Sequence, residues 1–224
     1  MGFNIAIDGP AGAGKSTIAK RVAREISFIY VDTGAMYRAI ALYFLKHHVS
    51  PKKEEEVKKA CDQIRIQICY ENQEQQVFLN GENVTPYLRT EEVGNMASVS
   101  SANPMVRQKL LDLQREIARK ENVLMDGRDI GSHVLPDAPL KIYLTASVQT
   151  RAERRYQELT EKGMVCDLEE IKRDIEQRDD RDMHRETAPL VQAEDAVLID
   201  SSDLTIDQVV QRILELYRQY DFTD

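Results

Sequence analysis

The sequence predicts an α/β protein with a mainly parallel, five-stranded sheet that is covered by helices on both faces. Short apolar runs near residues 4, 30, 124, 142 and 198 alternate with stretches whose apolar residues have helical spacing. Parallel strands need such crossover helices, which pack on both faces of the sheet. A patch of alternating residues interrupts the pattern after the second helix. These observations together predict a three-layer core with a small antiparallel insert.

The first two predicted strands each lead into a helix. Residues 3–8 form a short, mostly apolar run before a glycine-rich loop, which favours a buried strand. Apolar residues then recur at helical spacing over residues 15–26. The stretch from Phe28 predicts a short strand, a turn at residues 32–34 and a helix through Leu45.

The patch that follows predicts a small antiparallel lobe. A charged helical stretch gives way to three β-type runs at residues 65–70, 76–79 and 82–85. Asn80-Gly81 separates the last two runs and favours a tight hairpin turn, because both central positions of such a turn need positive φ. The lobe is therefore expected to be an insert between elements of the core.

Helices and strands alternate again after the insert. Helices are expected at residues 91–99, 104–120, 148–161, 167–182 and 205–220. Strands are expected at residues 123–126, 141–145 and 197–200. The chain is therefore expected to return to the same core sheet.

Composition narrows the function classes. The chain has 224 residues, of which 42% are hydrophobic and 30% charged, with a net charge of −8. This acidity excludes a general nucleic-acid or anionic-membrane binder. No apolar run approaches the ~18 residues of a membrane helix, and no signal peptide precedes the first strand. Three cysteines without metal-ligand spacing (Cys61, Cys69 and Cys166) favour a reduced, cytoplasmic protein. With no apolar stripe left over, a monomer is expected.

The glycine-rich loop has a recognisable pattern. Residues from Gly9 to Ser16 read GPAGAGKS and fit the phosphate-binding P-loop, G-x-x-x-x-G-K-[ST]. The loop lies between a predicted strand and a predicted helix, as that pattern requires. In such a loop backbone N–H groups cradle phosphates, Lys15 reaches the β- and γ-phosphates, and the hydroxyl of Ser16 is a Mg²⁺ ligand. The loop predicts a nucleoside triphosphate but not the acceptor.

Two predicted strands end in a carboxylate. Asp126 follows the apolar residues 123–125, where a Walker-B-type Asp acts on Mg²⁺ directly or through water. A strand-end Asp that caps the next element is the alternative. Asp8 ends the first strand, and we expect it to brace the loop rather than to take part in chemistry.

Arginines stand beside small polar residues in three places. Arg38 follows Tyr37 one turn into a predicted helix, and Arg128 precedes Asp129 just past a core strand, where parallel α/β sheets bind ligands. The third group contains Arg178, Arg181, Asp182 and Arg185. On a helix these four would share one face, which would repel itself unless an anion bound there. A salt-bridged surface helix is the alternative for this group.

Several motifs, in order along the chain, resemble bacterial cytidylate kinases. They are IDGPAGAGKST, DTGAMYR, RTEEVGNMAS, PMVRQKLLDLQR, LMDGRDIG, PDAPLKIYLTAS and RDDRDMHRETAPL. Many families share the P-loop, but DGRDIG together with RDDRD and the following APL is specific. The resemblance covers nearly the whole chain, including the insert.

The resemblance implies a role for each matching residue. ATP would be held by Gly9, Pro10, Ala11, Gly12, Ala13, Gly14, Lys15, Ser16 and Thr17. The acceptor's phosphate would be held by Arg38, Arg128 and Arg185, with Arg178 and Arg181 shared with the transferring group. The cytosine would be read by Ser98, Arg107 and Asp129, and the ribose by Asp182. Tyr37 and Thr33, which stands where many relatives have Ser, would also line the acceptor site. From the residues alone, Ser98 and Arg107 are typical of a helix surface.

The implied reaction is transfer of the γ-phosphate of ATP to CMP or dCMP, with Mg²⁺. Lys15, Arg128, Arg178, Arg181 and Arg185 would be the catalytic residues. The implied fold is that of P-loop NTPases, with core segments at residues 1–38, 103–150 and 189–224. A nucleoside-monophosphate-binding insert would occupy residues 39–102, and a helical lid residues 151–188.

Two other functions stay open from the sequence. One is a P-loop kinase for another small acceptor, such as UMP or a shikimate-like alcohol. The other is a GTPase-type switch, which normally carries N-K-x-D and D-x-x-G, and neither string occurs in the chain.

Overall fold

A computed structural model describes residues 2–72 and 74–220. The described chain divides into two compact units, one made of residue 2 with residues 31–121, the other of residues 3–30 with residues 122–220. These boundaries differ from the expected division into core, insert and lid. That division assigns CMP binding to the insert and closure to the lid, and it stays a prediction. Among the described helices, none has the length and apolar character needed to cross a bilayer.

The unit that begins at residue 3 is built on the five-stranded sheet that the sequence predicts. The strand order is β2-β6-β1-β7-β8, and β1 pairs in parallel with both β6 and β7, as β7 does with β8. The strands are β1 (Asn4–Asp8), β2 (Ile29–Asp32), β6 (Val123–Gly127), β7 (Leu140–Thr145) and β8 (Val197–Asp200). The division between the units falls inside β2. The predicted mainly parallel sheet is confirmed.

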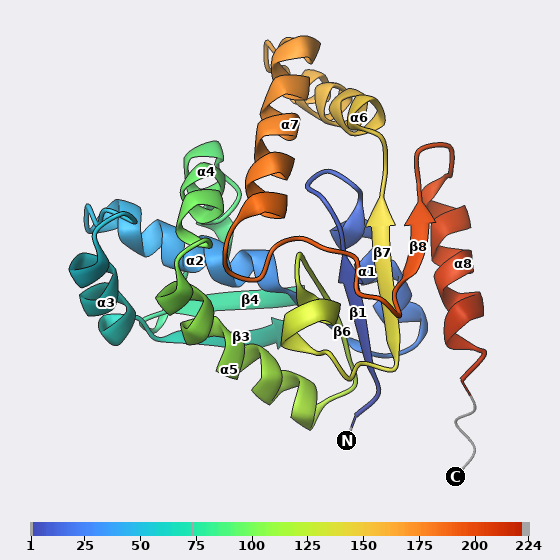
Figure 1. Ribbon diagram of the computed structural model, residues 1–224, viewed down its shortest axis with the longest axis horizontal. Coiled ribbons are helices and arrows are strands. Elements are labelled where there is room, and N and C mark those ends of the chain that lie inside the picture. The colour runs from blue at the N-terminus through green and yellow to red at the C-terminus, as the bar shows by residue number, and fades with distance from the viewer. Residues whose placement is uncertain (1, 73, 221–224) are drawn as a thin grey trace. The chain divides into compact units, whose positions relative to one another are not determined.

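Helices of this unit cover the sheet and extend beyond it. They are α1 (Lys15–Glu25), α6 (Val148–Glu161), α7 (Leu168–His184) and α8 (Ile206–Tyr217), with a π-helical turn η2 (Ile130–Val134). Apolar residues of α1 and α8, such as Ile18 and Ile213, pack into the core with strand residues such as Ile5 and Ile142. Helices α6 and α7 pack side by side and rise past the strand ends, as Figure 1 shows. Few of their residues are buried: Arg151 and Ala152 in α6, and Asp179 and Asp182 in α7.

The other unit carries the predicted antiparallel lobe. Its helices are α2 (Thr33–Lys46), α3 (Glu54–Gln63), α4 (Glu91–Ser100) and α5 (Pro104–Lys120), with a 3-10 turn η1 (Thr85–Tyr87). Strands β3 (Ile66–Glu71), β4 (Glu74–Leu79) and β5 (Glu82–Asn83) form a three-stranded sheet with antiparallel pairing. Asn80 and Gly81 both have positive φ (50° and 87°), so the predicted hairpin turn is confirmed.

The structure corrects two local predictions. No turn separates β2 from α2, because the Asp32 side chain accepts a hydrogen bond from Ala35 N at 2.8 Å and starts the helix directly at Thr33. The third β-type run is also shorter than expected, since the chain turns into η1 at Thr85. All three cysteines are free thiols, as expected.

Candidate active site

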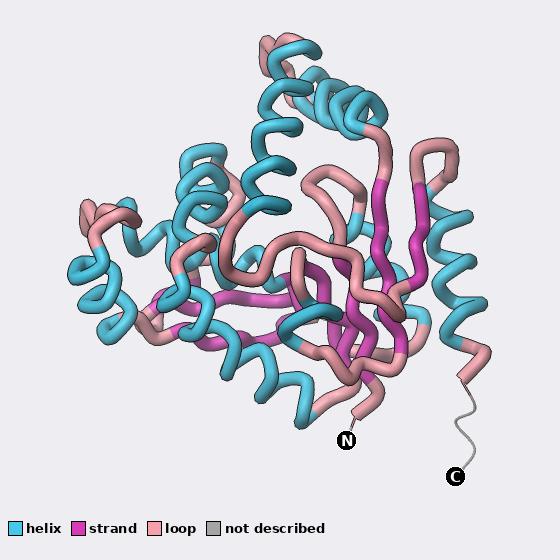
Figure 2. The backbone as a smooth tube through the Cα atoms, viewed as in Figure 1, coloured by secondary structure: helices cyan, strands magenta, loops and turns pink. Residues whose placement is uncertain are grey.

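The P-loop connects β1 to α1 (Figure 2), and it needs glycine for steric reasons. Gly9 has φ +148°, and a Cβ built there would lie 1.9 Å from the Leu144 carbonyl oxygen on β7. Gly14, at the N-cap of α1, is left-handed with φ 86° and leaves the helix without a side-chain cap. The first N–H groups of α1 therefore face the loop with no side chain to satisfy them, which suits a bound phosphate.

Lys15 is folded into the loop that precedes it. Its Nζ donates hydrogen bonds to the carbonyl oxygens of Gly9 (2.8 Å) and Pro10 (2.7 Å), and the residue is only 6% exposed. Burial and the nearby charge of Arg128 lower the pKa of Lys15 below its usual range, although Asp126 and Asp8 oppose this. A buried ammonium with carbonyl partners gains strongly from an anion beside it.

Ser16 and Asp126 lie together at the end of the loop. Ser16 Oγ donates a hydrogen bond of 3.0 Å to Asp126 Oδ2, and the Tyr30 hydroxyl donates one of 2.9 Å to Asp126 Oδ1. Asp126 is 4% exposed. The described residues contain no cluster of three or more His, Cys, Asp or Glu side chains that could hold a metal. A hydroxyl and a carboxylate nevertheless suit Mg²⁺, which takes few protein ligands and keeps waters and phosphate oxygens.

Asp8 braces a different segment from the one expected. Its Oδ1 accepts from Ile130 N and its Oδ2 from Gly131 N, both at 2.7 Å. Burial raises the pKa of Asp8 to about 7, although these two hydrogen bonds favour the charged form. The structural role is confirmed, but Asp8 fixes the turn after Asp129 rather than the P-loop.

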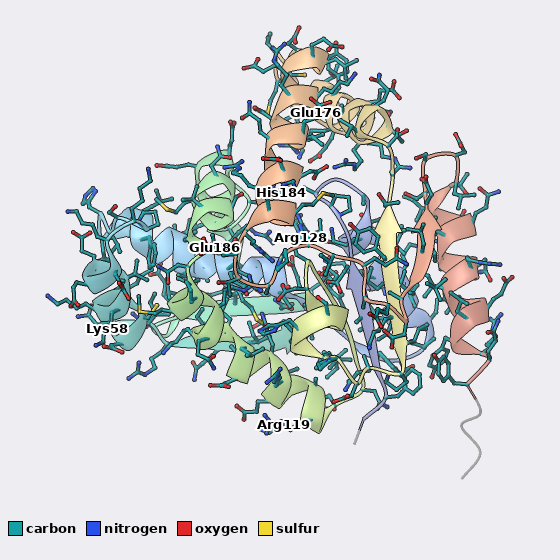
Figure 3. The ribbon with its side chains drawn as sticks, in the orientation of Figure 1. Lys58, Arg119, Arg128, Glu176, His184 and Glu186 are labelled. Carbon is teal, nitrogen blue, oxygen red and sulfur yellow. The ribbon has the colours of Figure 1, made fainter. Side chains whose placement is uncertain are left out.

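Arg128 is held by a carboxylate from α7. Its Nε donates to Asp182 Oδ2 at 2.9 Å, and the Asp182 side chain is only 8% exposed. Burial would raise the pKa of Asp182, but the charge and hydrogen bond of Arg128, with Arg178 and Arg185, lower it. Figure 3 labels Arg128 and, at the C-terminal end of α7, His184. This pair therefore joins the end of β6 to α7.

The remaining arginines do not share one helical face as predicted. Helix α7 ends at His184, and Arg185 is extended, with φ −66° and ψ 143°. Arg185 donates through Nε to Ala188 O at 2.8 Å and lies 3.5 Å from Asp129 through Nη2. Arg181 is exposed and bonds back to Gln177 O, whereas Arg178 is half-buried. The helix ends too early for the predicted spacing to include residue 185.

In the other unit, Asp32 holds Arg38. Arg38 Nη2 lies 2.9 Å from Asp32 Oδ2 within α2 and its cap. Gln75 on β4 bonds the Asp32 backbone in both directions, accepting from its N at 2.9 Å and donating to its O at 3.1 Å. Thr33, next in the chain, is 2% exposed. The small sheet thereby fixes the start of the helix that carries Tyr37 and Arg38.

Arg107 lies inside this unit rather than on a helix surface. It is 5% exposed, its Nη1 donates to Ser101 O at 3.2 Å, and its guanidinium lies 5.5 Å from the centre of the Tyr37 ring. Ser98 Oγ on α4 is buried and has no hydrogen-bond partner within the described chain. Buried polar groups that the fold leaves unsatisfied suit a polar ligand such as a nucleobase.

Two well-placed residues were missed from the sequence. Arg151 on α6 is 3% exposed and donates to the P-loop carbonyl of Ala11 at 3.0 Å. Gln75, described above, is 9% exposed. Their partners are backbone groups distant in sequence, so only a short RxxRR-type run around Arg151 could have drawn attention to it.

Comparisons with known proteins agree with the motifs. The sequence model of the cytidylate kinase family matches residues 5–219. A cytidylate kinase from Caldicellulosiruptor bescii is 50% identical over 215 residues, which is 96% of this chain and 95% of the relative. One from Halalkalibacterium halodurans is 49% identical over 212 residues, covering 95% and 96%. A solved structure of an uncharacterized protein from Eubacterium ventriosum has a TM-score of 0.53 at 14% identity, covering 98% of this chain and 100% of that one. This last likeness shows the fold.

Proposed function

The chain belongs to the cytidylate kinase family and transfers the γ-phosphate of ATP to CMP, and we propose that the residues described above divide this work as follows. Membership at this identity sets aside the alcohol kinase and the GTPase-type switch. The observation that carries the residue assignment is the P-loop with Lys15 buried in it, since a buried cation beside free helix N–H groups requires an anion.

The donor site consists of residues 9–17. Backbone N–H groups would bind the ATP phosphates, and Lys15 would leave the carbonyls of Gly9 and Pro10 for the β- and γ-phosphates. Ser16 and Asp126 would hold Mg²⁺, which supplies neutralisation of charge on the transferring group. The hydrogen bond between Ser16 Oγ and Asp126 Oδ2 would hold these two oxygens at the end of the loop before Mg²⁺ binds.

The acceptor residues would bind CMP through charge and hydrogen bonds. Arg38, Arg128 and Arg185 would hold its phosphate, and each has a carboxylate nearby that keeps its guanidinium in place. Ser98, Arg107 and Asp129 would read the cytosine, while Asp182 would contact the ribose. Thr33 and Tyr37 would flank this group. Arg178 and Arg181 would meet the transferring group.

No general base is required for this reaction. The acceptor oxygen belongs to a phosphate that is already ionised, so it can attack in line without losing a proton. Catalysis then rests on positioning and on neutralising the charge that spreads in the transition state. Lys15 and the arginines supply that positive charge, and exclusion of water by residues 151–188 would prevent hydrolysis of ATP.

The finer proposals concern substrate range and setting. We propose that dCMP is also accepted and that the enzyme acts as a cytoplasmic monomer in pyrimidine nucleotide metabolism, without nucleic-acid or membrane partners. Free thiols and a net charge of −8 support this.

A panel of acceptors tests the proposal. ADP release is measured with CMP, dCMP, UMP and shikimate, with Mg²⁺ present or chelated, and GTP is tried as the donor. CMP and dCMP should be turned over and shikimate should not. Binding of an ATP analogue by calorimetry gives a second readout for the metal: Ser16→Ala should lose most of the Mg²⁺-dependent gain in affinity that the wild type shows.

A further inference from the structure

The buried side chain of Arg151 connects three parts of the donor half of the molecule. Its Nε donates to Ala146 O at 2.9 Å, its Nη1 to Ala11 O at 3.0 Å, and its Nη2 to Asp179 Oδ2 at 2.6 Å. Ala146 directly follows β7, Ala11 lies in the P-loop, and Asp179 lies in helix α7. The planar guanidinium donates from three separate nitrogens in fixed directions, whereas a lysine ammonium donates from a single atom.

The stem of Arg151 also supports the loop. A Cβ placed on Gly12 would lie 3.4 Å from Arg151 Cβ and 3.8 Å from its Cγ, so the stem packs against the loop backbone. Arg151 and Asp179 are 3% and 7% exposed. A buried ion pair of this kind contributes through geometry, because desolvation offsets most of its Coulomb energy.

Asp179 is one of two buried residues of α7, together with Asp182. Arg178 precedes it, and Asp182, one turn later, bonds Arg128. Oδ1 of Asp179 is buried and has no hydrogen-bond partner within the described chain. Among the described residues, the Asp179 side chain therefore bonds only to Arg151, through Oδ2. A movement of the Ala11 carbonyl would therefore reach Arg178 and Asp182 through two rigid contacts.

We propose that Arg151 is a positioning residue that couples occupation of the P-loop to the placement of α7. When triphosphate fills the loop, Ala11 is fixed, Arg151 is fixed with it, and Asp179 then holds Arg178 and Asp182 at the positions from which they act. Arg151 itself transfers nothing. The inference rests on the proposal that residues 9–17 bind ATP.

Hydrogen exchange in α7 provides the test. In the wild type, a non-hydrolysable ATP analogue should slow exchange over residues 168–184. Asp179→Asn keeps the size of the side chain and leaves the P-loop contact of Arg151 intact. It should bind the analogue within about threefold of the wild type, lose most of the slowing in α7, and lower kcat by roughly 10-fold or more.

Two further variants keep the result interpretable. Arg151→Lys retains the charge but not the three separate donor nitrogens, so it should also lose the slowing in α7. Arg155→Ala removes an arginine of the same helix whose ion pair with Glu158 is about half exposed (47% for both side chains), and it should behave as the wild type.

The outcomes separate this inference from the site assignment. If the wild type fails to bind the analogue through residues 9–17, the donor-site proposal fails. If the analogue binds and α7 slows equally in the wild type, Asp179→Asn and Arg151→Lys, with kcat within about threefold, the coupling role of Arg151 is wrong.

Discussion

The donor loop and the acceptor arginines present positive charge in different ways. Lys15 is bonded to two backbone carbonyls of its own loop, whereas Arg38, Arg128 and Arg185 each lie beside a carboxylate. Lys15 is therefore positioned by backbone carbonyls, with Asp126 and Asp8 acting on it only through their charge. The arginines are positioned by side chains and already neutralised in part.

This difference predicts different responses to ligands and to mutation. A triphosphate would meet a lysine whose hydrogen bonds go to backbone carbonyls, so Lys15 should contribute strongly to binding of the donor. In the proposed site, CMP would share its arginines with Asp32, Asp182 and Asp129, so each single contact would contribute less to binding and more to orientation. Loss of Lys15 should therefore be the most damaging single change.

Replacing Lys15 should have the largest effect on activity of any single change in the donor loop or the acceptor arginines. Lys15→Met should lower kcat by about 10³-fold or more, because one charge contact in the transition state is lost. The fold should remain, since the side chain is replaced by one of similar length. Kinetics and thermal unfolding check both points. Lys20→Met on the same helix is the control, and a loss below about tenfold at unchanged stability would remove Lys15 from catalysis.

Base discrimination tests the acceptor side. Cytosine offers an N4 donor beside the N3 and O2 acceptors, whereas uracil offers O4 and N3–H. Asp129 and Arg107 match the first pattern, so we expect CMP to exceed UMP by about 10²–10³ in kcat/KM. Asp129→Asn should reduce that ratio, mainly through lower activity on CMP.

The exposed Asp137→Asn provides the matched control for that variant. If the wild type uses CMP and UMP within about threefold of each other, Asp129 and Arg107 do not read the base.

Arg128 tests whether an arginine paired with a carboxylate acts on one substrate. Arg128→Ala should raise KM for CMP by roughly 10–10²-fold and change KM for ATP little, because a charged hydrogen bond is worth about 1.5–3 kcal/mol. Arg173→Ala on the exposed side of α7 is the control. Equal losses for both substrates would assign Arg128 a shared or structural role.

The pH dependence of stability tests the role of Asp8, which ends β1 and accepts from Ile130 N and Gly131 N. The pKa of Asp8 is about 7 in the fold against 3.8 in the unfolded chain, so its stabilising contribution is complete below about pH 4 and is lost as pH rises through 7. Asp8→Asn removes this titration, so the wild type should gain more stability over it near pH 5, where Asp8 is protonated, than at higher pH. The gap should narrow toward about pH 8, by about 1.4 kcal/mol per pKa unit at most.

Urea unfolding at both pH values measures this gap. Asp200→Asn is the control, because the pKa of the exposed Asp200 is lowered by its bonds to Ser202 and its effect falls below this pH window. A gap for Asp8→Asn that does not change with pH would contradict the raised pKa.

Most of the fold could be predicted from the sequence, since it follows from local patterns. Apolar periodicity predicted the sheet and its helices, and Asn80-Gly81 predicted the hairpin. The P-loop was recognisable because glycine is required wherever a Cβ would collide, as at Gly9. These features depend on residues close together in the chain.

Other features could not be predicted because they depend on distant backbone groups. Arg151 donates a hydrogen bond to the carbonyl of Ala11. Asp8 accepts hydrogen bonds from N–H groups of a π-helical turn that no sequence pattern indicates. The burial of Arg107 against Tyr37 and the end of α7 before Arg185 have the same origin, since tertiary packing decides them.

One crossed binding experiment tests the contrast between donor and acceptor most directly. Calorimetry measures the affinity of an ATP analogue and of CMP for the wild type, Lys15→Met and Arg38→Ala. We expect Lys15→Met to weaken the analogue by about tenfold or more and CMP by less than about threefold, and Arg38→Ala to do the reverse. If each variant weakens both ligands to the same extent, the assignment of Lys15 to the donor and Arg38 to the acceptor is contradicted.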